Sequence, residues 1–325
     1  MSSKTAGCEK LSWFSKDIVD SNYLRRLTEK EKRLISDVIS MEEDTTITYS
    51  EVNNRNPVLR DLNPLFEEIN HKLINAQGFI IIEGFPTDAG IKSVGKIKKF
   101  FLNFCLYLGK PLRQNRNHDI IFDVKSIKGE NLHTKDFRGP YIKDALPMHT
   151  DAGAILGMYC LSSSELGGDT LLASARVVHD EIKRLRPDLL DILYKPFYVD
   201  RRNQEPEDAL PYDMSPIFAM HGNELVCQYH QPFYHDVHKK DKNIAPLSAT
   251  QLEALNLFDE ISMREDIAFK TKLHSGSVIF INNERILHGR TSFDFIESED
   301  TRYLLRIWLN SEKIKYTFPN FMGYL

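Results

Sequence analysis

The spacing of hydrophobic residues predicts a chain that begins with helices and continues as many short strands. Helical spacing of apolar residues is found in five segments, which are residues 24–39, 63–76, 93–108, 177–193 and 248–263. Short apolar runs between glycine or polar turns predict strands, which are residues 79–82, 120–124, 155–161, 170–173, 217–220, 225–229, 278–281 and 301–309. The fourth helix is expected to break at Arg186-Pro187, and Ser248 and Gln251 form a capping box at the start of the fifth.

A polar interruption in this pattern, Met148-His149-Thr150-Asp151-Ala152-Gly153, carries candidate chemistry. In extended backbone the side chains of residues i and i+2 point to the same side, so one metal ion could contact both His149 and Asp151. The signal is weak alone, because 11 His and 46 acidic residues in 325 positions give about one or two such triplets by chance. The second triplet begins at His179 in a helical pattern, where side chains two apart diverge, and His179 is interpreted as helix surface.

A second motif far downstream strengthens the first. Residues 276–291 predict a glycine turn, a buried strand, a short turn and a second strand that carries His288. One carboxylate and two imidazoles are the ligands of the facial triad that holds non-heme Fe(II) and leaves open coordination positions. The strand over residues 301–309 then places Arg302 and Arg306 on one face. Two arginines on a largely apolar strand are costly unless an anion pairs with them.

These motifs together resemble the Fe(II)/2-oxoglutarate-dependent oxygenases of the taurine dioxygenase and clavaminate synthase-like type, over about residues 78–310. The resemblance implies that His149, Asp151 and His288 bind iron and are the catalytic residues, with Fe(II), 2-oxoglutarate and O₂ as the cofactors. It also implies that Arg302 pairs with the distal carboxylate of 2-oxoglutarate. Thr170, in Gly-Gly-Asp-Thr, would bond the same cosubstrate. Arg306 matches a position that can meet a substrate carboxylate.

The expected fold is mainly β with α decoration (α+β). It is a double-stranded β-helix, a cupin-like jelly-roll barrel with an N-terminal helical region. One oxygenase domain is expected over residues 1–325, with a helical and loop extension over residues 1–60 and the jelly-roll core over about residues 78–310. The polar segment 109–139 is either a lid over the pocket or a solvated loop. The segment 198–213 is polar and proline-punctuated, and is expected to line the substrate mouth.

The composition favours a small-molecule enzyme. A net charge of −4 and a pI near 6.3 give no general attraction to nucleic acid or anionic membranes. The chain has no apolar run of 18 residues and no signal peptide, so a cytoplasmic location is expected. Four scattered cysteines indicate reduced thiols rather than a disulfide or zinc framework. The oligomeric state is left open.

The predicted reaction is hydroxylation or desaturation of an unactivated C–H bond in a small molecule, such as an amino acid or natural-product intermediate. It is coupled to the decarboxylation of 2-oxoglutarate to succinate and CO₂. Two alternatives stay open at this point: a catalytically silent jelly-roll that senses a metabolite, and a cupin-type metalloenzyme that does not use 2-oxoglutarate. A second metal site at His230, His235 and His238 is also conceivable, but a solvated loop is the preferred interpretation because the spacings are not standard for ligands.

Overall fold

A computed structural model of the chain describes residues 12–45, 47, 55–87, 93–115, 117–125, 144–203, 205, 208–293 and 302–314. The part of segment 109–139 that was considered as a lid lies outside these residues from position 126 onwards. Residues 315–325 and Cys8, one of the four cysteines, also lie outside them.

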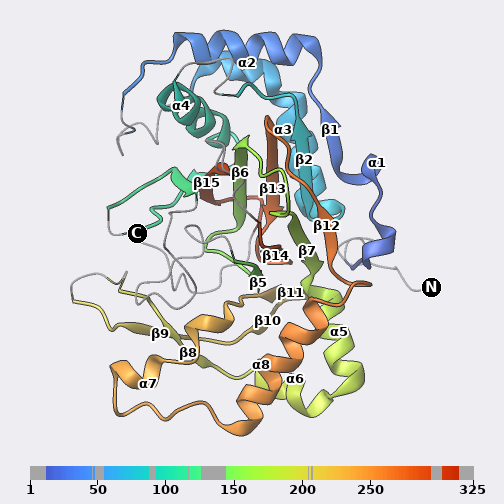
Figure 1. Ribbon diagram of the computed structural model, residues 1–325, viewed down its shortest axis with the longest axis vertical. Coiled ribbons are helices and arrows are strands. Elements are labelled where there is room, and N and C mark those ends of the chain that lie inside the picture. The colour runs from blue at the N-terminus through green and yellow to red at the C-terminus, as the bar shows by residue number, and fades with distance from the viewer. Residues whose placement is uncertain are drawn as a thin grey trace.

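Two β-sheets pack against each other in the middle of the molecule (Figure 1). The larger sheet has seven strands in the order β1-β2-β13-β6-β15-β3, and β4 pairs with β15 as well. Its strands are β1 (Leu24–Arg26), β2 (Phe79–Glu83), β3 (Lys110–Pro111), β4 (Phe122–Lys125), β6 (Ile155–Ser162), β13 (Ser277–Asn282) and β15 (Tyr303–Asn310). The smaller sheet has the order β12-β7-β14-β5. Its strands are β5 (Leu146–His149), β7 (Thr170–Ser174), β12 (Phe269–Thr271) and β14 (Ile286–Arg290).

Helices cover the outer side of each sheet, at the top and the bottom of Figure 1. Those on the side of the larger sheet are α2 (Glu29–Met41), α3 (Asn63–Asn75) and α4 (Val94–Cys105), with η3 (Pro57–Leu62) before α3. Those on the side of the smaller sheet are α5 (Ala175–Leu185), α6 (Pro187–Leu193) and α8 (Ala249–Ser262). The shorter helices are η1 (Ser15–Asp17), α1 (Asp20–Tyr23), η5 (Gln231–Phe233) and α7 (Val237–Lys240). Two further strand pairs lie outside the two sheets. These pairs are β8 (Phe197–Asp200) with β9 (Tyr212–Ser215), and β10 (Phe218–His221) with β11 (Glu224–Cys227).

The period of two along the strands produces three hydrophobic clusters. On β13, Ile279 and Ile281 face the space between the sheets, whereas Val278 and Phe280 face the helices α3 and α4. On β7, Leu172 faces inward, and its neighbours Leu171 and Ala173 pack with α5 and α8. The interior between the sheets is therefore a packed core, and polar side chains placed among these inward positions need specific partners.

This architecture confirms the predicted helix-decorated α+β jelly-roll. The break at Arg186-Pro187 and the capping box at Ser248 are also found as predicted. Among the described residues, no helix has the length and apolar character needed to cross a membrane. The single-domain organisation stays a prediction.

Two predictions of local structure were wrong. Residues 24–26 form strand β1, parallel to β2, and the helix begins only at Glu29, where Thr28 caps it. His179 lies in a helix as predicted, but it is only 7% exposed and is not helix surface. Its ring nitrogens bond Asp180 and the hydroxyl of Tyr194, at 2.7 and 2.9 Å. These partners satisfy both nitrogens, and burial lowers the pKa of His179.

Candidate metal centre

His149, Asp151 and His288 are brought together at one end of the interior. His149 ends β5, Asp151 lies in the loop that follows, and His288 is on β14, directly paired with His149 across the two strands. One ligand atom from each of the three lies within 4.8 Å of the other two. In the part of the chain that the structure describes, this is the one group of three or more His, Cys, Asp or Glu residues arranged to hold a metal ion.

A hydrogen bond of His149 and the position of the His288 ring on β14 leave a nitrogen of each histidine facing the group. Nδ1 of His149 lies 2.9 Å from the carbonyl oxygen of Pro147, an arrangement in which Nδ1 donates and Nε2 is unprotonated. Nε2 of His288 lies 3.6 Å from Oδ2 of Asp151. Because Nε2 is the usual metal-binding atom of histidine, these orientations fit a metal ligand set.

The charges of the three groups also fit a divalent ion. Burial lowers the pKa of His149 well below its usual range, and the nearby rings of His288 and His230 act in the same direction. Burial alone would raise the pKa of the Asp151 carboxyl, but Arg306 and His288 hold it well below its usual range. At neutral pH the centre thus offers a neutral imidazole and an ionised carboxylate, which are the forms that bind metals.

Arg306 lies beside Asp151. Its Nη1 bonds both carboxylate oxygens, at 3.3 and 3.1 Å, and its Nε donates to Gln114 at 2.9 Å. The guanidinium also lies over the rings of Trp308 and Phe122, at 4.4 and 5.3 Å from their centroids. Trp308 shares the inward face of β15, as the alternation predicts, and these contacts hold the guanidinium against Asp151.

Arg302 lies in the same interior and is only 7% exposed. Its guanidinium carbon is 5.8 Å from the centroid of Phe293, and a Cβ on Gly168 would come within 3.2 Å of its Cδ. Gly168 is two residues before Thr170, whose own side chain is buried. Within the described residues no carboxylate pairs with Arg302, and burial lowers its pKa to about 10. A cation that is buried in this way is suited to an anionic ligand.

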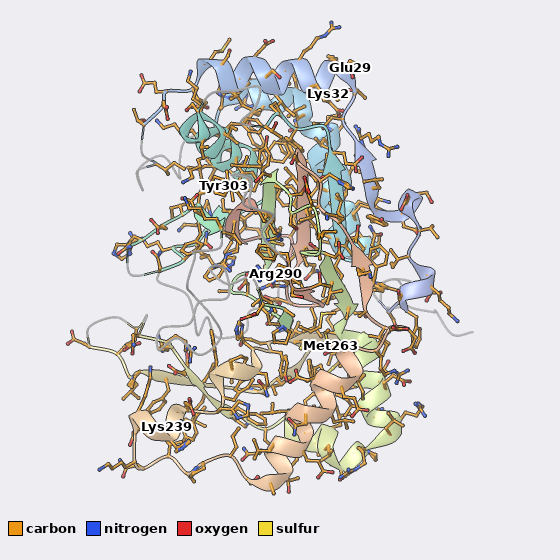
Figure 2. The ribbon with its side chains drawn as sticks, in the orientation of Figure 1. Glu29, Lys32, Lys239, Met263, Arg290 and Tyr303 are labelled. Carbon is orange, nitrogen blue, oxygen red and sulfur yellow. The ribbon has the colours of Figure 1, made fainter. Side chains whose placement is uncertain are left out.

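Arg290 is a second buried cation in this region that the sequence reasoning missed. It stands opposite Thr170 in the register of β14 and β7, and its guanidinium carbon is 4.7 Å from the centroid of Phe293. Figure 2 shows Arg290 near the middle of the molecule, between the upper helices and α8. Its Nη2 donates to the carbonyl oxygen of Asp144, and burial, with the charge of Arg302, lowers its pKa to about 9. Its spacing of two from His288 was the available signal.

His230 lies next to this group, whereas a solvated loop was the preferred interpretation of its segment. Its ring lies 4.8 Å from that of His149 and is stacked on Phe233 at 3.8 Å. Burial lowers the pKa of His230 to about 4. His235 and His238 are not part of any metal-binding group among the residues described. No local spacing pointed to the contact, because it is made across the fold.

Comparison with known proteins gives a consistent picture. Residues 44–308 match the family described as "Taurine catabolism dioxygenase TauD, TfdA family". The chain is 27% identical over 242 residues to FR-33289 synthase of Streptomyces rubellomurinus, which is 72% of this chain and 69% of that protein. It is 24% identical over 321 residues to the taurine hydroxylase-like protein SAT17 of Stachybotrys chartarum, which is 96% of this chain and 81% of that protein.

Solved structures share the fold at low sequence identity. Asparagine oxygenase, in a complex with Fe(II), 3-hydroxyasparagine and succinate, has a TM-score of 0.68 at 16% identity, covering 89% of this chain and 93% of that chain. The non-heme iron oxygenase OrfP, with Fe and alpha-ketoglutaric acid, has a TM-score of 0.60 at 16% identity, covering 89% of this chain and 94% of that chain.

The barrel and its His, Asp and His group are those of a mononuclear non-heme iron enzyme. The family match spans most of the chain, and the protein therefore belongs to the TauD, TfdA family of dioxygenases. This membership confirms the predicted enzyme class, an Fe(II)/2-oxoglutarate-dependent dioxygenase that uses O₂.

Proposed function

We propose that this dioxygenase oxidises a C–H bond of a small polar molecule, an amino acid or a natural-product intermediate, by hydroxylation or desaturation. The observation that carries the proposal is the group of His149, Asp151 and His288 within 4.8 Å of one another, with buried Arg302 in the same interior. Bound there, Fe(II) with 2-oxoglutarate and O₂ would supply the oxidising chemistry, in which 2-oxoglutarate becomes succinate and CO₂.

The ligand set is the first part of the proposal. His149, Asp151 and His288 would hold the ion, and the ion pair with Arg306 keeps the Asp151 carboxylate ionised and fixes its rotation. Two backbone-paired strands and one loop thus position the donors before any metal arrives, and little reorganisation is needed on binding.

Arg302 and Thr170 form the second part, as the proposed site for the distal carboxylate of 2-oxoglutarate. The fork of a guanidinium can donate two parallel hydrogen bonds to a carboxylate, and a threonine hydroxyl can add a third. The burial of both side chains supports this role, because a desolvated cation gains most from an anion that shares its environment. Arg290, beside them on Phe293, would add positive charge to the same end of the interior.

The substrate side is the third part. Arg306 borders the metal ligand Asp151, where a substrate carboxylate would meet it, and the substrate role predicted for Arg306 stays a proposal. From His149 the rings of His230 and Phe233 lead outward to Arg202, whose guanidinium carbon is 5.3 Å from the Phe233 centroid. Arg202 lies between β8 and β9, in the segment that was expected to line the mouth.

The relatives support a substrate of this size and polarity. The asparagine oxygenase structure contains 3-hydroxyasparagine, and an OrfP structure contains L-Arg. We therefore place free amino acids first among the compounds to be tested, with succinate release above the uncoupled background as the measure. A cytoplasmic location is the setting in which we expect this reaction.

The ligand set is tested by a pair of buried histidines. The anaerobic protein with Fe(II) and 2-oxoglutarate should give a weak visible charge-transfer band, which requires the chelate to form. His288→Ala should remove the band and the release of succinate, whereas His179→Ala should retain both, because His179 bonds Asp180 on α5 and Tyr194 at the end of α6 and not the metal group. A retained band in His288→Ala, with far-UV circular dichroism showing both variants folded, would disprove the proposed ligands.

A further inference from the structure

We infer that Asn283 is a positioning residue for the metal centre, whose side-chain amide fixes the loop of Asp151 relative to the strand of His288. Asn283 precedes β14 in the turn that follows β13, and is five positions before His288 in the sequence. Its side chain reaches the loop that follows β5, which is more than a hundred residues away along the chain. The inference deepens the proposed function and rests on the proposed ligand set.

Both polar atoms of the Asn283 side-chain amide form hydrogen bonds with the Asp151 loop. Oδ1 of Asn283 accepts a hydrogen bond from the backbone N–H of Asp151 at 2.9 Å. Nδ2 donates to the carbonyl oxygens of Asp151 and Gly153, at 2.6 and 2.9 Å. The backbone N–H of Asn283 adds a bond to the carbonyl oxygen of Ala154 at 3.0 Å. Asn283 is only 2% exposed, so these bonds are sheltered from competing water.

The loop needs such an anchor because it carries a ligand without being part of a strand. Residues 150–154 connect β5 of the smaller sheet to β6 of the larger sheet, and their buried backbone groups must find partners outside a ladder. Gly153 has a φ of +81°, and a Cβ there would lie 3.0 Å from the carbonyl oxygen of Leu309, so the path of the loop is tightly constrained. On its other side, Thr150 exchanges bonds with the backbone of Tyr229.

The Asn283 amide connects the positions of two proposed ligands, Asp151 and His288. His288 is fixed by the pairing of β14 with β5 and β7, and Asn283 is attached to the start of the same strand through a short turn. Because its amide holds the backbone of Asp151 itself, any shift of the loop away from the turn would move the carboxylate away from the Nε2 of His288. A metal site tolerates little displacement of its donors, and outer residues that orient ligands commonly contribute 10- to 100-fold in metal affinity.

The neighbouring Asn282 provides a matched control. It has the same side chain and is 0% exposed, but its Nδ2 donates to the carbonyl oxygen of Leu73, at the end of α3 and away from the ligands. A loss of stability from deleting a buried amide should appear at both positions. A loss of metal affinity should appear only at Asn283.

The experiment titrates Co(II), a spectroscopically visible probe, into the parent protein and into Asn283→Ala and Asn282→Ala, with melting temperatures measured in parallel. We expect Asn283→Ala to bind Co(II) about 10- to 100-fold more weakly than the parent, and Asn282→Ala to stay within about threefold of it. Asn283→Asp and Asn282→Asp form a second pair, to be used if an alanine variant does not fold. Aspartate keeps the size of the side chain but lacks the amide hydrogens that Asp151 and Gly153 accept.

Two results would overturn the inference. In one, Asn283 variants retain the parent affinity. In the other, the Asn282 and Asn283 variants lose affinity equally, in proportion to their loss of stability, which is the behaviour of a merely structural amide. His288→Ala is titrated alongside to test the ligand set separately. If the parent binds Co(II) no better than His288→Ala does, the proposed ligands are wrong and the role of Asn283 is wrong with them.

Discussion

Replacing Arg302 with methionine should weaken the binding of 2-oxoglutarate and should make the ligand-free protein more stable. Methionine keeps a long unbranched side chain, so packing around Phe293 changes little. The Arg302 side chain that it replaces is only 7% exposed, and its charge has no carboxylate partner in the described part of the chain. Burying an unpaired cation costs free energy, and its removal should raise the melting temperature without ligand.

The expected loss of 2-oxoglutarate binding can be estimated from the ion pair that Arg302 would form with the distal carboxylate. Truncating one partner of a buried, hydrogen-bonded charge pair costs about 2–5 kcal/mol, which corresponds to a 30- to several-thousand-fold rise in the apparent KM for 2-oxoglutarate. Arg302→Lys keeps the charge but loses the fork. We expect it to lose about one hydrogen bond to a charged group, roughly 1.5–3 kcal/mol or about 10- to 150-fold.

The assay is succinate release titrated in 2-oxoglutarate, with thermal unfolding measured in the presence and absence of the cosubstrate. Arg285→Met is the matched control, because Arg285 is also 7% exposed but pairs with Glu224 at 2.5 Å on the turn before β14. It should lower stability and leave the titration in 2-oxoglutarate unchanged. If Arg302→Met titrates like the parent, or if Arg285→Met shifts the titration as strongly, the assignment of Arg302 to the cosubstrate is refuted.

Two further substitutions test the electrostatics of the interior. Arg306→Lys should weaken Co(II) binding, more at pH 6 than at pH 8, because Asp151 loses the guanidinium that holds its pKa low; equal binding to the parent at both values would contradict this. Burial raises the pKa of Glu284 to about 8, so the stability that the protonated acid contributes is present below pH 4.5 and is lost as the pH rises to about 8. The free energy of unfolding in urea should change less between pH 5 and 8 in Glu284→Gln than in the parent, by several kcal/mol as an order of magnitude. An unchanged dependence of this free energy on pH would exclude Glu284 as the titrating group.

The parts of the site that were predictable from sequence are those fixed by local geometry. Alternation in extended backbone grouped His149 with Asp151 and Arg302 with Arg306; in the structure His149 and Asp151 do meet at one site, although Asp151 lies in the loop after β5 and Arg302 just before β15. These statements need only the period of two and the position of the strand. Pairing the first motif with His288 was possible because the ligand chemistry requires a third donor, although nothing local connects the two stretches.

The parts that were missed depend on contacts across the fold. His230 lies against His149 only because the segment after β11 returns to the smaller sheet, and its spacing from His235 and His238 carried no information about that return. Strand β1 has three residues and exists through its pairing with β2, so its apolar spacing could equally suit a helix. His179 was assigned to the correct element but to the wrong side of it, since Tyr194 on the far side of the α5–α6 break completes its burial.

The contacts that place the proposed ligands explain why the centre can be preformed. None of the ligands belongs to the three hydrophobic clusters, which stabilise the sheets and helices without any ion. His149 and His288 are placed by strand pairing, and Asp151 by the amide of Asn283, so the geometry of the donors is stabilised by backbone hydrogen bonds. A metal ion that meets a preformed site stabilises the fold by mass action alone, through its concentration relative to its dissociation constant. It follows that removing the metal should lower the melting temperature only by this linkage, whereas loosening the Asp151 loop should lower the affinity itself.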